Sequence, residues 1–159
     1  MTPAIAYLKS AGIDFKVHEF ESSESRSYGT EAARALGLPA DRVFKTLLVK
    51  IDAQRLVVAV LPVNRELNLK LLAAAVKGKR AAMASAREAE RATGYVLGGI
   101  SPLGQRQALV TVLDASALEH ATIFVSAGRR GLELELSGSV LRSLCHAKVT
   151  SITRAGSAA

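Results

Sequence analysis

The chain has 159 residues and a mass of 16.8 kDa, which fits a single domain with one core. Its hydrophobic fraction of 49% is mostly aliphatic and its aromatic fraction is only 4%, which disfavours base stacking on aromatic side chains. The formal net charge of +7 favours a polyanionic partner such as a nucleic acid or a phosphorylated ligand, although a basic proteome background would give the same balance.

Cysteine content and apolar runs indicate the compartment. Cys145 is the only cysteine, which excludes a disulfide within the chain and favours a reducing environment. No apolar run approaches the ~18 residues needed to span a bilayer. The segment MTPAIAYLKSAG at the N-terminus is typical of a helix rather than of a signal peptide. We therefore expect a cytoplasmic protein that makes no membrane contact.

Apolar periodicity predicts strands and helices in mixed order. In chain order we expect a helix at 2–12, a strand at 15–20, a helix at 30–36, strands at 43–51 and 56–62, helices at 68–77 and 85–94, strands at 109–114, 122–126 and 132–137, a helix at 140–144 and a strand at 147–152. Strands and helices do not alternate strictly, so we expect a mixed sheet in one α+β or α/β domain. This domain would cover residues 1–154.

Local signals define the ends of these elements. Thr2, Thr30 and Asn68 are predicted N-caps, and Ser85 with Glu88 has the spacing of a capping box. Glycines at positions 12, 37, 78 and 94 follow the first four helices. The polar segment ESSESRSYG, residues 21–29, shows no periodicity and is expected to be a mobile loop. Residues 155–159 are expected to be a disordered tail.

The sequence shows no metal-binding pattern. His18, His120 and His146 are far apart, and neither C-x-x-C nor H-x-x-x-H occurs. Cys145 and His146 suggest a thiol beside its base, but adjacent side chains on a helix point in different directions. A lone cysteine after leucines is more typical of the core. We expect no metal and no cofactor.

The glycine-rich stretch GYVLGGISPLGQ, Gly94 to Gln105, contains no Asp, Glu, Lys, Arg, Cys or His and no clear motif. Ser101 misses the last position of the G-x-S-x-G nucleophile pattern, and the known phosphate-binding glycine patterns are also absent. Two interpretations remain open. The stretch is either an ordinary long turn or a loop whose backbone N–H groups bind a carbonyl oxygen or an oxyanion.

Lys45 is the second candidate functional residue. It lies in the apolar strand VFKTLLV, residues 43–49, beside Phe44 and Leu47. A lysine in this position either extends its charged end to solvent or places a cation in a pocket. The residues alone leave both interpretations open.

Four segments together resemble the YbaK family of bacterial deacylases. They are the opening MTPA, VFKTLLV at 43–49, TGYVLGGISPLGQ at 93–105 and ATIFVSAGRRGLELEL at 121–136, in order over about residues 2–154. This family hydrolyses cysteinyl-tRNA(Pro), the product of an error by prolyl-tRNA synthetase. The resemblance implies a YbaK-like fold, which is a mixed, largely antiparallel, barrel-like sheet with flanking helices.

The resemblance also implies a catalytic lysine and a substrate-binding loop. The family lysine corresponds to Lys45, which would bind the terminal adenosine or its phosphate and orient the ester, with Thr46 beside it. The family loop lines the pocket and holds the aminoacyl ester partly through its backbone. It corresponds here to Gly98, Gly99, Ile100 and Ser101. A side chain at Gly98 or Gly99 would occupy substrate space.

Three further positions correspond to residues of the family pocket. The pocket serine corresponds to Ser126. Two positions differ from the family pattern, because Phe20 stands where a tyrosine is usual and Glu133 where an aspartate is usual. Phe20 retains the apolar wall but lacks a hydroxyl donor, and Glu133 retains an acid that reaches one methylene further. These differences affect the expected preference for the amino acid rather than the fold.

The mechanism implied by the resemblance uses no protein nucleophile. The thiolate of the substrate's own cysteine attacks the ester carbonyl, and the amino acid leaves as a cyclic thiolactone. The enzyme would supply orientation, which can contribute on the order of 7 to 11 kcal/mol. The implied partners are aminoacyl-tRNA, bound at the acceptor end of tRNA(Pro), and prolyl-tRNA synthetase.

Two other functions remain open at this point. One is a deacylase for alanyl or another small aminoacyl ester that uses a bound water molecule. The other is a non-catalytic module that binds a nucleotide or the end of a tRNA without turnover.

Overall fold

The structure, a computed structural model, describes residues 1–22 and 28–154. The predicted tail and residues 23–27 of the predicted mobile loop lie outside the described residues. The helices are α1 (Pro3–Ser10), α2 (Tyr28–Leu36), α3 (Leu69–Ala75), α4 (Ala86–Thr93) and α5 (Gly138–Cys145), with 3-10 turns at Ala40–Arg42 and Ala115–Glu119. The strands are β1 (Lys16–Glu19), β2 (Phe44–Ile51), β3 (Arg55–Pro62), β4 (Glu66–Leu67), β5 (Ala81–Met83), β6 (Thr111–Asp114), β7 (Ile123–Ser126), β8 (Leu132–Leu136), β9 (Lys148–Thr150) and β10 (Thr153–Arg154).

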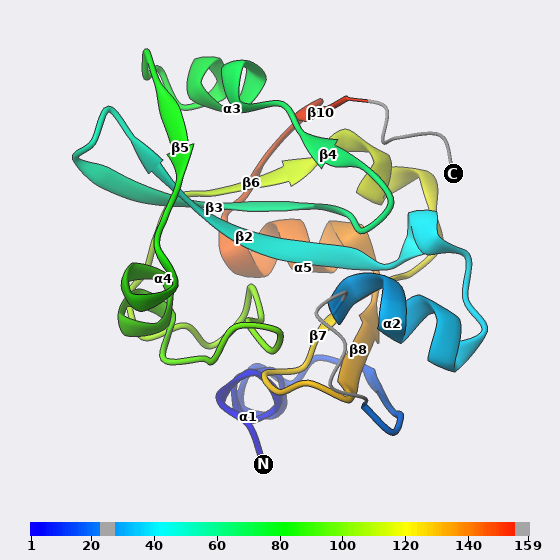
Figure 1. Ribbon diagram of the computed structural model, residues 1–159. Helices are drawn as coiled ribbons and strands as arrows, with labels where there is room; N and C mark the ends of the chain where they lie inside the picture. Colours follow the sequence, from blue (N-terminus) through cyan, green and yellow to red (C-terminus); the bar gives the residue numbers. More distant parts are fainter. Residues whose placement is uncertain (23–27, 155–159) are drawn as a thin grey trace.

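A mixed sheet with strand order β5-β2-β3-β6-β9 forms the centre of the molecule (Figure 1). β2 is antiparallel to β3 and to β5, whereas β6 is parallel to β3 and to β9. A second, antiparallel sheet has the order β1-β8-β7, and β10 pairs with β4. The predicted mixed and largely antiparallel fold is confirmed, but the strands are divided between separate sheets and do not close into one barrel.

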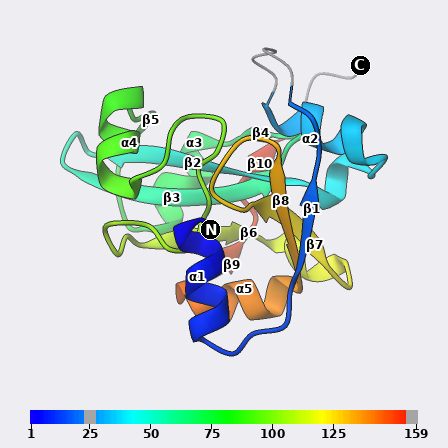
Figure 2. The same cartoon turned by 90° about the horizontal axis from the view of Figure 1, so that it is seen from below.

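Successive side chains of β2 point to opposite faces of the central sheet. On one face, Phe44 and Leu48 belong to the larger part of the core, which is completed by β7, β8, α1 and α5. On the other face, Val49 and Ile51 pack with Leu72 of α3. Figures 1 and 2 show α3 on one side of the central sheet, with β7 and β8 on the other. Both faces of the sheet are therefore covered.

Side-chain caps hold several helices as predicted. The side chain of Thr2 caps α1, and that of Asn68 accepts a hydrogen bond from the backbone of the first turn of α3. Ser85 and Glu88 form both hydrogen bonds of a capping box at the start of α4. Ser137, predicted as the last residue of a strand, caps α5 instead. Each cap satisfies a backbone N–H that the helix itself leaves free.

The second helix begins earlier than predicted. α2 starts at Tyr28, so Thr30 lies within the helix and is not its N-cap. The helix thus gains Tyr28 and Gly29, and Gly29 packs closely: a Cβ at this position would lie 2.3 Å from Cγ1 of Val63. Glycine thus allows the start of α2 to lie directly against the residue that follows β3.

The third helix also ends differently from the prediction. The helix ends at Ala75 rather than at residue 77, and Lys77, with φ of 58°, adopts a left-handed conformation just before Gly78. A Cβ on Gly78 would lie 2.3 Å from Cγ2 of Ile51, so this glycine serves close packing rather than a turn. None of the helices within residues 1–22 and 28–154 is long and apolar enough to cross a membrane.

Candidate active site

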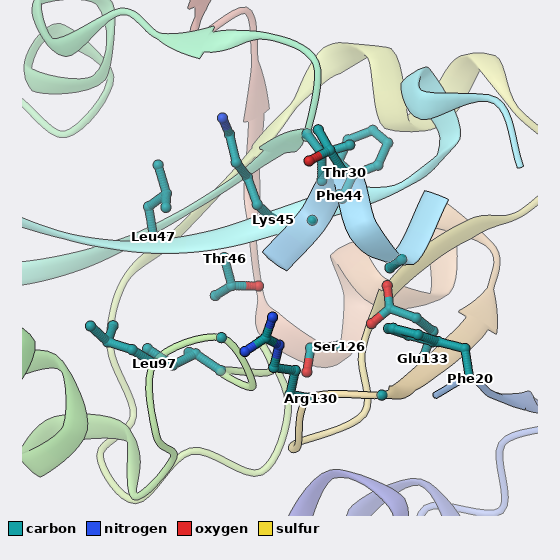
Figure 3. Close-up of a pocket in the computed structure, with 16 residues that line it drawn as sticks. Phe20, Thr30, Phe44, Lys45, Thr46, Leu47, Leu97, Ser126, Arg130 and Glu133 are labelled. Atoms are coloured by element: carbon teal, nitrogen blue, oxygen red, sulfur yellow. The ribbon is translucent and has the colours of Figure 1, made fainter. Parts of the chain in front are cut away.

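A cavity of about 400 Å³ lies beside the first half of β2 (Figure 3). This volume is within the range of small-molecule sites. Its walls come from β2, α2, the end of β1, the loop after α4 and the β7–β8 region. The lining residues are Phe20, Gly29, Thr30, Ala32, Phe44, Lys45, Thr46, Leu47, Val63, Leu97, Gly98, Ile100, Ser126, Arg130, Gly131 and Glu133.

Most residues expected at the site from the sequence line this one cavity. These residues are Phe20, Lys45, Thr46, Gly98, Ile100, Ser126 and Glu133. They come from segments far apart in the chain, which the fold brings together. Gly99 and Ser101, expected at the same site, lie outside this lining.

The cavity lies where β2 lacks a neighbouring strand on one side. On the side away from β3, an isolated bridge joins Val43 to Phe124, and β5 pairs only with Val49–Ile51. The backbone of Ala84 also donates a hydrogen bond to Leu48. In the described part of the chain, no strand pairs with the outer edge of residues 45–47 between these contacts. This gap in the sheet is the open side of the cavity.

Lys45 and Thr46 point to opposite faces of β2, as neighbouring strand residues must (Figure 3). Lys45 is half-buried, and burial lowers the pKa of its ammonium group, which the nearby charge of Glu66 partly offsets. The charged form of Lys45 is therefore incompletely solvated. An anionic group bound beside it would restore the lost stabilisation.

Ser126 and Glu133 stand opposite each other on β7 and β8, with their side chains on the same face of the sheet. Oγ of Ser126 accepts a hydrogen bond from the backbone N–H of Gly128 at 3.1 Å, so its hydroxyl hydrogen can point elsewhere. Glu133 is only 7% exposed, and burial raises the pKa of its carboxyl to about 8. Near neutral pH this carboxyl is mostly protonated and can donate a hydrogen bond.

Arg130 is a cavity residue that the sequence did not identify as one. Nη2 of Arg130 lies 3.0 Å from Oε2 of Glu31, so this ion pair joins the turn before β8 to α2. The only signal in the sequence was the small basic cluster of Arg129 and Arg130. Thr30, Phe44 and Leu97 also line the cavity, although the sequence indicated only a helix cap, a neighbour of Lys45 and a part of the glycine-rich stretch for them.

Gly99 serves the packing of the glycine-rich loop. Its backbone N–H donates to the carbonyl oxygen of Val96 at 2.9 Å. A Cβ at this position would lie 2.7 Å from Cα of Arg129 and 2.9 Å from the backbone nitrogen of Arg130. A side chain would thus collide with the β7–β8 turn rather than occupy space in the cavity.

Ser101 likewise shapes the loop from within. It is fully buried, and its Oγ accepts a hydrogen bond from the backbone N–H of Leu103 at 3.3 Å. Nearby, the hydroxyl of Tyr95 donates to the carbonyl oxygen of Leu103 at 2.7 Å, and burial raises the pKa of Tyr95 to about 12. Only part of the loop, including Gly98 and Ile100, reaches the cavity. The stretch is therefore both a folded turn and a cavity wall.

Cys145 packs against the core, away from the cavity lining. Its thiol donates a hydrogen bond to the carbonyl oxygen of Pro102 at 3.5 Å, and burial raises its pKa to about 12. A thiol in this state is a poor nucleophile. Within residues 1–22 and 28–154, no three His, Cys, Asp or Glu side chains come together in a way that could hold a metal ion.

Sequence comparison relates this chain to editing proteins. The sequence model of the aminoacyl-tRNA editing domain matches residues 23–144. A protein of Enterococcus faecalis, EbsC, named as a proposed Cys-tRNA(Pro)/Cys-tRNA(Cys) deacylase, is 36% identical over 152 residues, which cover 96% of this chain and 93% of EbsC.

Solved structures share the fold. A proposed trans-editing enzyme for prolyl-tRNA synthetase superposes with a TM-score of 0.85 at 22% identity, covering 96% of this chain and 95% of that one. The hypothetical protein APE2540 superposes with a TM-score of 0.83 at 26% identity, covering 96% of this chain and 99% of that one. The arrangement of strands and helices around the cavity is thus shared with these structures.

Proposed function

The chain belongs to the family of aminoacyl-tRNA editing domains, as its sequence suggested, and on this premise we propose that it removes cysteine from mischarged cysteinyl-tRNA(Pro) in trans. As an aminoacyl-tRNA deacylase, it cleaves the ester that joins an amino acid to the terminal ribose of a tRNA. The choice of cysteine is supported by the relative EbsC, whose name specifies cysteinyl-tRNAs. Prolyl-tRNA synthetase, which makes the mischarged product, is the proposed partner, and the cytoplasm is the proposed location.

The observation that carries this proposal is the convergence of Lys45, Gly98, Ser126 and Glu133 on one cavity. At about 400 Å³, the cavity can take an aminoacyl ester with its ribose, but not the body of a tRNA. The rest of the tRNA would lie outside on a protein whose net charge of +7 favours contact with phosphates.

The residues have distinct roles in the proposed reaction. Lys45 binds the terminal adenosine or its phosphate, where a bound anion stabilises its half-buried cation. The backbone of the loop at Gly98 holds the ester, and the hydroxyl of Ser126 is a hydrogen-bond donor inside the cavity. Glu133 in its protonated form adds a second donor. Phe20 supplies an apolar wall.

The chemical step uses the substrate's own thiol. The thiol loses its proton, the sulfur forms a bond to the ester carbonyl carbon, and the bond from that carbon to the ribose oxygen breaks. The ribose oxygen takes up a proton, leaving free tRNA and a cyclic thiolactone of cysteine. The enzyme supplies orientation and hydrogen bonds to the oxygen that becomes negative. An alanyl ester lacks this nucleophile.

Hydrolysis of cysteinyl-, alanyl- and seryl-tRNA(Pro) by the purified protein tests the proposal, with the small product identified by trapping. We expect rapid loss of the cysteinyl ester alone and a trapped thiolactone. Faster loss of the alanyl ester would indicate the water-dependent reaction instead. No hydrolysis of any of the three would contradict the proposal and favour a module that binds without turnover.

A further inference from the structure

The backbone of Thr46 faces the gap in the central sheet. In an antiparallel pair, the N–H and C=O of one residue point to the same side of the strand, and the side alternates from residue to residue. The backbone N–H of Val63 donates to the carbonyl of Val43, so odd-numbered residues of this strand face β3. The N–H of Ala84 donates to the carbonyl of Leu48, so even-numbered residues face the other side. Thr46 is thus directed toward the cavity.

The polar groups of Thr46 lack partners in the described part of the chain. Its Oγ1 is buried and accepts or donates no hydrogen bond there. No strand, loop or side chain among residues 1–22 and 28–154 pairs with its backbone N–H and C=O either. Buried polar groups nearly always have a partner, because an unpaired one has lost its hydrogen bonds to water without replacement. One buried hydroxyl and two backbone groups that face the gap, all on one cavity residue, indicate a ligand that pairs with them.

An aminoacyl ester has the groups that this edge requires. Its α-amino group and its ester carbonyl are arranged as the N–H and C=O of one residue in a strand. We propose that the backbone of Thr46 binds the aminoacyl group as an antiparallel strand residue would, with the Thr46 N–H donating to the ester carbonyl and the Thr46 C=O accepting from the α-amino group. This inference rests on the proposed deacylase function and concerns how the same site holds its substrate.

This pairing fixes the direction of the substrate. If a peptide strand were bound here in antiparallel direction, the residue after the one that pairs with Thr46 would stand opposite Lys45. In the aminoacyl ester, the ribose takes the position of this next residue. The terminal nucleotide therefore extends toward Lys45, which the proposed function already assigns to it. The α-amino group lies at the other end, toward Leu48, whose carbonyl is already paired with the backbone N–H of Ala84.

The pairing also fixes the face on which the amino-acid side chain lies. Side chains of directly paired residues share one face, with Cβ atoms roughly 4.5–5.5 Å apart. An L-amino acid thus places its side chain beside that of Thr46, on the side of β2 where Ser126 and Arg130 lie (Figure 3). A D-amino acid would direct it to the face that carries Lys45. Thr46 is therefore a positioning residue that also contributes to specificity.

Proline at position 46 tests the backbone donor. Thr46→Pro removes the N–H that faces the gap together with the threonine hydroxyl, at a position where strands tolerate proline, and it leaves the bonds to β3 intact. We expect kcat/KM for L-cysteinyl-tRNA(Pro) to fall by about 10²-fold, the effect of losing one donor to a developing oxyanion. Thr46→Val retains the N–H and loses the hydroxyl, and we expect a fall of about tenfold or less, mainly in discrimination between side chains.

Val17→Pro is the matched control. Phe20 donates its backbone N–H to Gly131, so Val17 at the outer edge of β1 faces away from β8, and it is 43% exposed. This variant should fold and hydrolyse the ester like the wild type. A folded Thr46→Pro protein with wild-type activity, or a Thr46→Val protein that is as impaired as Thr46→Pro, would overturn the proposed pairing.

Amide hydrogen exchange of the wild-type protein provides a test that does not depend on the proline variant folding. With the non-hydrolysable L-cysteinyl amide of 3′-amino-3′-deoxyadenosine bound, we expect the Thr46 amide to exchange at least tenfold more slowly than in the free protein. With the D-cysteinyl analogue bound, we expect a smaller reduction of the exchange rate. If the L-analogue binds but the exchange rate of the Thr46 amide does not change, the ligand lies elsewhere in the cavity and the inference is overturned. Failure of the wild-type protein to hydrolyse any aminoacyl-tRNA would instead refute the proposed function.

Discussion

The two halves of β2 have the same apolar character and one lysine each, but they differ in how they are paired. Leu48–Ile51 has hydrogen-bonded neighbours on both sides, whereas Phe44–Leu47 pairs with β3 and, beyond the bridge to Phe124 at its start, has no strand on its other side among the described residues. The fully paired half contributes to the core, and the half-paired one lines the cavity. A strand can therefore carry both a structural and a binding segment, and the boundary between them is set by the neighbouring strands.

Proline inside the fully paired half should have the largest effect. Val49 is fully buried, and its backbone faces β3, so Val49→Pro removes a hydrogen bond in the middle of the sheet. Proline inside a regular element costs about 3 kcal/mol or more, and we expect Val49→Pro to unfold or nearly unfold the protein. Urea denaturation beside Thr46→Pro measures the difference. Equal stability of the two variants would contradict the distinction between the halves.

Replacing Glu133, which faces the half-paired segment across the cavity, should change how stability depends on pH. The pKa of this carboxyl is about 8 in the folded protein, against 4.5 ordinarily, so the unfolded chain loses its proton first. The free energy of unfolding therefore falls as pH rises from about 4.5 to about 8, by up to roughly 1.4 kcal/mol per pH unit. We expect Glu133→Gln to remove this slope in urea denaturation at pH 5 to 8.

Glu135 on the same strand is the matched control for this experiment. Hydrogen bonds from Thr122 and His18 hold the pKa of Glu135 below its usual range, so it is ionised throughout pH 5 to 8. Glu135→Gln should lower stability and keep the slope due to Glu133. A slope that survives in Glu133→Gln would show that other groups cause it.

Lys45→Ala should affect catalysis and leave the fold intact. We expect hydrolysis of cysteinyl-tRNA(Pro) to fall at least tenfold, which corresponds to about 1.4 kcal/mol of transition-state stabilisation. Single-turnover rates together with circular dichroism measure the two effects. Full activity of the folded variant would mean that Lys45 only extends its charge to solvent.

Lys50→Ala is the corresponding change in the fully paired half and should have the smallest effect. Lys50 forms an ion pair with Glu88 of α4, and both side chains are about one-third exposed. Partly exposed pairs of this kind contribute roughly 0.2–1 kcal/mol, so we expect a small loss of stability in urea and unchanged hydrolysis. A Lys50→Ala loss of activity comparable to that of Lys45→Ala would remove the functional contrast between the halves.

Features with local causes were predictable from the sequence. The capping box of Ser85 and Glu88 needs only the spacing of two residues, and the β2–β3 hairpin follows from two apolar runs around a short turn. β5 was not predicted, because Ala81–Met83 is too short and too poor in β-branched residues to signal a strand. The gap beside Thr46 depends on where β5 and β7 end, which no local pattern encodes.

The candidate site was predictable mainly through family resemblance. That resemblance pointed to Lys45, Ser126 and Glu133, all of which line the cavity. It also pointed to Gly99, whose actual constraint is contact with the backbone of the turn at Arg129. A glycine required for packing and one required for substrate have the same appearance in a sequence, because both simply lack a side chain.

The pairing of β1 with β8 has a consequence for how the protein is made. Lys16 pairs with Glu135, so β1 has no partner until synthesis has passed residue 135. At about 5–20 residues per second, this delay is on the order of ten seconds. Phe20 is synthesised before this delay and Glu133 at its end, and both residues line the cavity. The nascent chain therefore cannot complete its binding site while its C-terminal third is still being translated.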